Sequence, residues 1–422
     1  MWKAKRRWLE RLRALPQQIL NLLKGKMGNV AYSLEEAPAA GVLHPLPAGV
    51  NLIKQQTDSL LRRPPRGIAP LPAAEQYLVE RLREEAARLN RNNVTRTAAY
   101  LDIYRQHPEL HWAFLAHMVS RNGGWTMTDL KGELLPCLLG AGQRESLFRF
   151  LERANGLIFY DAYPQLLLYR ESTRTGRRLT HLLPHLGVTE FMIAVWDEFH
   201  RTRDSALLTC CLIVNEQHFI EERIVQSAYF KEHVLDTLAF KTQSLLQMNQ
   251  VLFPYAGPEG GNRLRLAGLI LENFADLSER IRFGQSLYAI LFAQPDVYRG
   301  AHHFAVSTPH TGSRADYWPE LFAEVRHSAP NPVYRPRLNG SCLAAGAEPL
   351  FSPRLAHAWK DRPVEPPEPG DWCRGQVGRN ALKLLPSRLH VPFDFDMSQE
   401  YPYALNKIEL AIMAAQELGT KA

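Results

Sequence analysis

The sequence predicts an all-α protein, with a multi-helix globular body and an irregular, proline-rich C-terminal extension. Of the 29 prolines, 8 lie in residues 1–72 and 12 in residues 327–422, which leaves 9 for the long stretch between them. Because proline disrupts helix interiors, the middle of the chain is expected to be the regular part. Apolar residues there recur at three- and four-residue steps, and no alternating pattern with hairpin turns is present.

The overall composition is that of an ordinary globular protein. The 422 residues are 45% hydrophobic and 22% charged, and no apolar run approaches the roughly 18 to 20 residues that cross a bilayer. Five cysteines are an odd number, and none form a Cys-x-x-Cys pair. This pattern argues against a disulfide framework and a cysteine-rich zinc site. A cytoplasmic location is therefore expected, with the inner face of the membrane as the alternative.

The N-terminal segment, residues 1–27, is basic and amphipathic. Residues 1–26 carry eight Lys or Arg side chains against one acidic residue, which accounts for the whole net charge of +7. Apolar residues such as Trp8 and Leu12 follow at helical spacing, so the segment is expected to lie on an anionic membrane or to pack on the body or a partner. The rest of the chain is about neutral, which argues against a nucleic-acid partner. Residues 28–72 are predicted to be a linker.

The body, residues 73–326, is predicted to consist of successive helices separated by capping and glycine signals. Asn93 is expected to cap one helix, and Asn122-Gly123-Gly124 and Asn155-Gly156 are expected to end two others. Residues 327–422 are predicted to be irregular apart from a closing helix. Helices are expected at about 51–62, 73–89, from 94, 108–122, 126–139, 143–155, 189–203, 205–227, 230–252, 264–292 and 403–418.

Polar residues that interrupt apolar runs give the clearest functional signal, because a buried polar group costs a few kcal/mol unless it is paired. Asp161 and Gln165 interrupt the run 157–169 and share one face if that run is helical. Asn215 and Glu216 end the apolar run before them. Each pair indicates either a functional site or a hydrogen-bonded structural network, and Asp161 also suits a helix N-cap.

Two further stretches place cationic and amide groups where anions bind, near helix ends and a glycine turn. One is residues 120–131 and the other is residues 309–319, in which Ser313 and Asp316 resemble a capping box. Ordinary capping and salt bridges explain the same residues. The catalytic candidates from all four stretches are Asp161, Glu216 and His310, and the ligand-binding candidates are Arg121, Asn122, Lys131, Gln165, Asn215, Ser313 and Arg314.

No metal site is predicted and no cofactor is indicated. His218 and Glu222 are four residues apart, but a zinc or di-iron site needs more ligands than this pair. The sequence also lacks a phosphate-binding Gly-x-x-x-x-Gly-Lys loop, a dinucleotide fingerprint, a His-Glu-x-x-His motif and a Gly-x-Ser-x-Gly motif.

Several strings in one order resemble a bacterial family described only as domain of unknown function 2515, from Bacillus and related spore formers. The resemblance spans about residues 90–325. It implies a bacterial, cytoplasmic protein and assigns no activity or catalytic residue. The strings are His111-Trp112, residues 117–123, residues 127–133, residues 161–165, Asn215-Glu216-Gln217 and residues 310–314.

Two hypotheses for function follow. The first is an enzyme or ligand-binding protein for a small anionic compound bearing a phosphate or carboxylate, whose candidate residues meet in one pocket. The second is a membrane-peripheral or scaffolding protein that acts through residues 1–26. The sequence leaves open whether there is a reaction, and it gives no oligomeric state.

Overall fold

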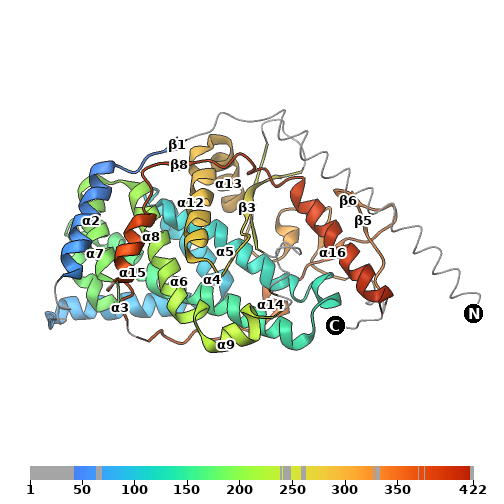
Figure 1. Cartoon of the computed structure of the whole chain (residues 1–422), viewed down its shortest axis with the longest axis horizontal. Coiled ribbons are helices and arrows are strands. Elements are labelled where there is room, and N and C mark those ends of the chain that lie inside the picture. Colours follow the sequence, from blue (N-terminus) through green and yellow to red (C-terminus); the bar gives the residue numbers. More distant parts are fainter. Residues whose placement is uncertain are drawn as a thin grey trace, which may run out of the picture.

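The computed structural model describes residues 42–62, 69–237, 240, 249–257, 263–326, 328, 333–368, 370–374 and 376–418. The basic N-terminal segment and the first part of the predicted linker lie outside the described residues. The helices form an elongated body, with α2 and α7 at one end and α16 at the other (Figure 1). Within the described parts of the chain, no helix is both long and apolar enough to cross a bilayer.

The described chain is mostly helical, and its strands are few and short. The α-helices are α2 (Pro47–Leu61), α3 (Ala73–Leu89), α4 (Asn93–Gln106), α5 (His111–Asp129), α6 (Ala141–Thr175), α7 (Glu190–Thr202), α8 (Ser205–Ile220), α9 (Ala228–Phe230), α12 (Leu277–Ala293), α13 (Pro295–Ser307), α14 (Leu355–Ala358), α15 (Gln376–Ala381) and α16 (Glu400–Glu417). The 3-10 turns are η1 (Leu135–Cys137), η2 (Thr180–Leu186), η5 (Arg314–Asp316) and η6 (Leu382–Leu384), and the π-helical turns are η3 (Glu221–Val225) and η4 (Lys231–Leu235). The strands are β1 (Val42–Leu43), β2 (Gln250–Tyr255), β3 (Arg265–Ile270), β4 (Phe322–Ala323), β5 (Leu338–Asn339), β6 (Cys342–Leu343), β7 (Leu350–Phe351) and β8 (Leu389–His390).

Helices that carry a clear apolar stripe and a capping residue form where the sequence predicts them. Helix α3 matches its predicted range, and α7 begins after Thr189, whose hydroxyl accepts a hydrogen bond from the Met192 amide. The cap of α4 is one residue earlier than predicted. Asn92 forms a capping box with Thr95, and Asn93 is the first helical residue. This leaves the Asn93 side chain free to point into the body.

The predicted helix ends at Asn122-Gly123-Gly124 and Asn155-Gly156 are wrong. Helix α5 runs through the first and α6 through the second, so no new helix begins near residue 126. These glycines serve close packing: a Cβ at Gly124 would overlap Asn93 and His310, and one at Gly156 would overlap Val364. Glycine therefore fits positions where another side chain approaches the helix closely.

An antiparallel hairpin corrects the prediction that the body is wholly helical. Strands β2 and β3 pair from Gln250 opposite Ile270 to Tyr255 opposite Arg265. Strand β2 begins inside the helix predicted at 230–252, and β3 lies inside the one predicted at 264–292. Short apolar runs do not distinguish a buried strand from a buried helix. At Gly268 an added Cβ would lie on the backbone carbonyl of Val251, so the hairpin requires glycine there.

The segment predicted as an extension, residues 327–422, packs into the same core as the body. It contains short strands and helices as well as the closing helix, α16. Strand β8 pairs with β1, and β7 pairs in parallel with β4. Buried side chains from the segment, such as Trp372 and Leu405, belong to the main apolar cluster. The C-terminal segment therefore supplies part of the wall of the small cavity described below.

Candidate functional site

Asp161, Gln165 and Asn215 meet in one buried network between α6 and α8. Asn215 donates to Asp161 Oδ2 over 2.6 Å, and Gln165 donates to the same oxygen over 3.3 Å. Asn215 Oδ1 accepts from Thr189 Oγ1 at 2.9 Å and from Trp372 Nε1 at 3.0 Å. These four hydrogen bonds join Asp161 and Asn215 to each other and to three further polar side chains.

Burial raises the pKa of Asp161 to about 7, although the hydrogen bond from Asn215 opposes the shift. Gln165 is also held from its other side, because Trp196 Nε1 donates to Gln165 Oε1 over 2.8 Å. Asn215 and Gln165 are at most 1% exposed. A ligand would have to displace an existing partner to reach the amide groups of Gln165 and Asn215.

Arg121 and His310 lie in a second buried network beside α5. Asp316 joins them, with its Oδ2 at 3.9 Å from Arg121 Nη2 and 3.5 Å from His310 Nδ1. His310 Nε2 lies 2.9 Å from Asn93 Oδ1, and Arg121 donates to the carbonyl of Thr308. Burial lowers the pKa of Arg121 to about 10, so the guanidinium stays charged at neutral pH and Asp316 balances that charge.

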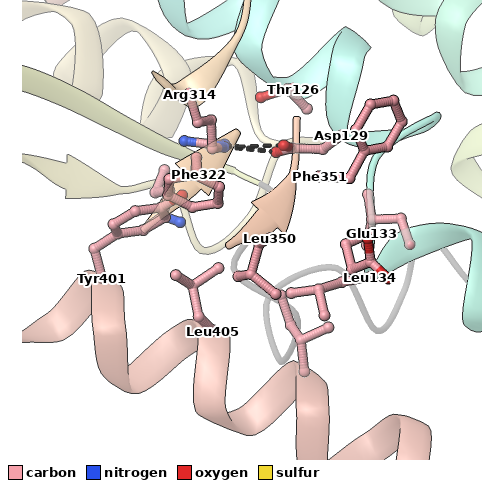
Figure 2. A pocket seen from close by; sticks show the side chains of 13 residues that line it. Thr126, Asp129, Glu133, Leu134, Arg314, Phe322, Leu350, Phe351, Tyr401 and Leu405 are labelled. Atoms are coloured by element: carbon pink, nitrogen blue, oxygen red, sulfur yellow. Dashed lines mark hydrogen bonds and ion pairs between the residues drawn. The ribbon is translucent and has the colours of Figure 1, made fainter. Parts of the chain in front are cut away.

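Arg314 lines a small cavity of about 50 Å³ near α16 (Figure 2), and Ser313 precedes it in the chain. Ser313 caps the turn η5, as its position in the sequence predicts. The Arg314 guanidinium forms an ion pair with Asp129 over 2.7 Å and donates to the Tyr317 hydroxyl. Tyr401 of α16 closes the other side. Arg314 therefore reaches the cavity with its charge already paired.

Lys131 lies away from both networks and is exposed. Its ammonium group sits 4.4 Å from the centre of the Trp359 ring, which is a cation–π geometry. Trp359 in turn stacks on Phe148. The predicted anion-binding residues thus lie in separate places, each with its own partners.

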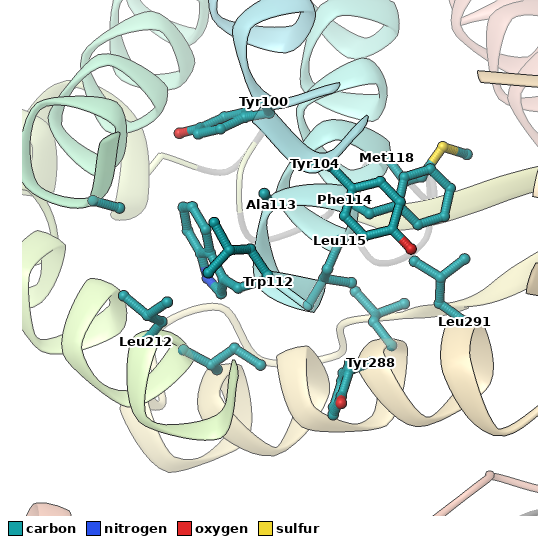
Figure 3. Close-up of a cluster of buried hydrophobic side chains, with 14 of the residues drawn as sticks. Tyr100, Tyr104, Trp112, Ala113, Phe114, Leu115, Met118, Leu212, Tyr288 and Leu291 are labelled. Carbon is teal, nitrogen blue, oxygen red and sulfur yellow. The ribbon is translucent and has the colours of Figure 1, made fainter. Parts of the chain in front are cut away.

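A larger cavity, of about 250 Å³, lies between α5, α6, α8, α12 and strand β2. Its walls are mainly apolar and aromatic, and they include Tyr100, Trp112 and Leu115, which Figure 3 shows within the buried cluster. A cavity of about 150 Å³ holds a benzene molecule, so this one has room for roughly ten non-hydrogen atoms.

Glu216 is the predicted catalytic residue that lines this cavity. Its Oε2 accepts from Trp112 Nε1 at 3.1 Å, and its Oε1 lies 3.4 Å from Gln217 Nε2. Burial raises the pKa of Glu216 to about 8, which outweighs both hydrogen bonds. At neutral pH the carboxyl group is therefore mostly protonated and has an O–H to donate.

Asn122, a predicted ligand-binding residue, also lines the large cavity, but its side chain is hydrogen-bonded to the backbone of β2. Its amide group donates to the carbonyl of Leu252 over 2.8 Å, and its carbonyl accepts from the Leu252 amide at 2.8 Å. This pair of hydrogen bonds fixes β2 to α5. Gln250, at the start of β2, consequently reaches the same cavity.

The sequence analysis missed Trp112, Gln217 and Gln250 as cavity residues. Trp112 and Gln217 occur in the strings that carry the family resemblance, and this membership was the sequence feature that could have identified them as candidates. Gln250 had none, because it falls in a stretch predicted as helix. Its position follows only from the pairing of β2 with β3.

The described residues contain no group of three or more His, Cys, Asp or Glu side chains arranged to hold a metal ion. His218, at metal-ligand spacing from Glu222, has its Nδ1 2.8 Å from the carbonyl of Val214 and stacks on Trp372. Its surroundings are those of a core histidine.

Comparison with known proteins places this arrangement in a family. The model of a protein family of unknown function, DUF2515, matches residues 88–390. The chain belongs to this family. It is similar to the uncharacterized protein YppC of Bacillus subtilis (strain 168), with 42% identity over 243 residues, which is 58% of this chain and 74% of that protein. No solved structure matches. The family match covers every residue that lines the large cavity, whereas α16 lies beyond it.

Proposed function

We propose that this protein binds a small, mainly apolar molecule in the large cavity and that Glu216 holds it by donating a hydrogen bond. The observation that carries the proposal is the position of the Glu216 carboxyl group in the wall of a mainly apolar cavity, where burial raises its pKa to about 8. Ligand sites commonly combine apolar walls with a few polar groups that fix orientation. A protonated carboxyl favours a ligand that presents a hydrogen-bond acceptor, such as a carbonyl oxygen.

The polar neighbours of Glu216 support this assignment. Gln217 Oε1 accepts from Arg280 Nε over 3.0 Å, and the Arg280 guanidinium also pairs with Glu221. Trp112 is a donor only. Glu216 is thus held in place by its neighbours while its own proton remains available to a ligand.

The sequence predicted a ligand that bears a phosphate or carboxylate group. Such a ligand requires a different kind of site. It needs a cation that faces the ligand, whereas Arg121 and Arg314 have Asp316 and Asp129 as carboxylate partners. Arg280, which lines the large cavity, is likewise paired with Glu221. We therefore favour a neutral ligand, and the experiment below includes an anionic probe.

Binding of three probes with equal numbers of non-hydrogen atoms tests the proposal: acetophenone, isopropenylbenzene and benzoate. Titration calorimetry at pH 6.5 should give the tightest binding for acetophenone, by about tenfold over isopropenylbenzene, because only acetophenone accepts a hydrogen bond and is neutral. Equal affinities for the first two would refute the role of Glu216. A preference for benzoate would favour the anionic ligand instead.

Two substitutions of Glu216 test whether this residue causes the preference for acetophenone. Glu216→Gln keeps a donor and should keep the preference for acetophenone, whereas Glu216→Leu should lose it while still binding isopropenylbenzene. Ala116→Leu adds methyl groups to the cavity wall and should weaken all three probes alike. Above about pH 9, Glu216 is ionised and wild type should behave like Glu216→Leu.

A further inference from the structure

Among the described residues, both hydrogen-bond partners of the Glu216 carboxyl group are donors. Trp112 Nε1 lies 3.1 Å from its Oε2, and Gln217 Nε2 lies 3.4 Å from its Oε1. An indole N–H can only donate, whereas a primary amide can turn over and present either its NH2 group or its oxygen. The orientation of the Gln217 amide therefore decides whether Gln217 donates to Glu216 or accepts from it.

Arg280 of α12 fixes that orientation. Its Nε lies 3.0 Å from Gln217 Oε1. A guanidinium group has donors only, so the amide oxygen must face Arg280 and the NH2 group must face Glu216. Arg280 is 3% exposed and is held from two other sides, because it donates to the carbonyl of Phe274 and pairs with Glu221 of η3. With these three contacts, the guanidinium group keeps the Gln217 amide in one orientation.

We infer that Arg280 is a specificity-determining residue of the large cavity: by holding the oxygen of Gln217, it prevents Gln217 from accepting the proton of Glu216 and so leaves that proton for the ligand. This inference rests on the proposed function. Without Arg280 the amide can turn over, and its oxygen then accepts the O–H of Glu216. That internal hydrogen bond would replace the one to the ligand, and the cavity would no longer distinguish a carbonyl compound from a hydrocarbon of the same size.

A matched pair of substitutions at Arg280 tests the inference by titration calorimetry with acetophenone and isopropenylbenzene at pH 6.5. Arg280→Lys keeps a group that can only donate, so it should keep the roughly tenfold preference for acetophenone. Arg280→Met has an unbranched side chain without a donor and should bind the two probes equally. An unchanged preference in Arg280→Met would overturn the inference, although the proposed function would stand.

Substitutions at Gln217 leave Arg280 in place and give an independent measurement. In Gln217→Glu, one carboxylate oxygen can pair with Arg280 and the other replaces the NH2 group, so it should accept the proton of Glu216 and abolish the preference. Gln217→Leu offers no acceptor and should keep the ratio of the two affinities. The double variant Arg280→Met, Gln217→Leu should recover that ratio for the same reason, which a general disturbance of the cavity would not produce.

Two further results would overturn the inference. One is a preference for acetophenone that persists in Gln217→Glu, and this result decides the matter even if Arg280→Met does not fold. The other is a double variant that does not recover the preference lost in Arg280→Met. A wild type that binds acetophenone and isopropenylbenzene equally would instead refute the proposed function, and the role of Arg280 would fall with it.

Discussion

Asn215 and Glu216 are neighbours on α8, yet they face opposite kinds of environment. Asn215 is fully buried and satisfies Asp161, Thr189 and Trp372. Glu216 turns towards a mainly apolar cavity, where its hydrogen-bond partners among the described residues are Trp112 and Gln217. The contrast shows two different environments of a buried polar group. Asn215 holds the fold together, and Glu216, in the function that we propose, donates a hydrogen bond to a bound molecule.

The largest loss of stability is expected when the buried network of Asp161, Gln165 and Asn215 is broken. Asn215→Leu leaves Asp161 without its nearest donor and leaves the hydroxyl of Thr189 and the indole of Trp372 without an acceptor. We expect the free energy of unfolding to fall by about 4 kcal/mol in urea titrations, because three buried groups lose partners at once. A loss below about 1 kcal/mol would show that the network is not structural. Glu216→Gln at pH 4, where the carboxyl group is protonated in the folded protein, is the matched control and should be nearly neutral.

Two adjacent glycines of α5 also differ in their surroundings: Gly124 is tightly packed, whereas Gly123 lines the large cavity. Gly124→Ala should lower the free energy of unfolding by about 3 kcal/mol, because the new Cβ would overlap Asn93 and His310. Gly123→Ala faces the large cavity, and its Cβ would meet only the side-chain end of Asn155 at 3.2 Å.

The Gly123→Ala variant should therefore stay within about 1 kcal/mol of wild type, since alanine also favours the helix. Thermal and urea unfolding of the two variants side by side would check this. Equal losses would show that the wall is packed on both sides.

The pH dependence of stability should single out Glu216. Its pKa is raised from 4.5 to about 8 in the folded protein, so its contribution is complete below about pH 4.5 and is lost as the pH rises through 8. Glu216→Gln lacks this titration. The variant should gain on wild type between pH 5 and pH 9, by about 2 kcal/mol, in urea titrations at several pH values. A constant difference would mean an ordinary pKa.

The smallest change in stability is expected on substitution of Asp161 by asparagine. Because burial raises its pKa to about 7, the group is partly neutral near pH 7 and an amide can replace it. Asp161→Asn keeps an oxygen for the donors of Asn215 and Gln165, so stability at pH 4, where the folded carboxyl group is neutral, should change by less than about 1 kcal/mol. A much larger loss would show that the network needs the negative charge.

The sequence correctly predicted helices whose capping signals lie within one turn. Its predictions were wrong where residues far along the chain determine the local structure. Thr189 begins α7 as expected, because a cap acts within one turn. The glycines of α5 and α6 were mistaken for helix ends, since their reason is a neighbour such as His310 or Val364, far along the chain. The same holds for β2, whose partner strand selects its conformation.

The candidate site was predictable only in part, for a similar reason. An interruption in an apolar run reveals that Asn215 and Glu216 are unusual, but adjacent residues point to different sides of a helix. Which one meets a network and which one meets a cavity depends on α6, α7 and α12. Gln250 gave no signal of its own.

Helix α16 has a consequence for how the protein is made. Tyr401, Leu405 and Ile408 form one wall of the small cavity, so this chamber has no closed form until residues 401–408 have left the ribosome. During synthesis, at about 5 to 20 residues per second, earlier helices can pack while Arg314 and Asp129 still face water. Helix α16, which is translated after the other elements that line this cavity, completes the enclosure.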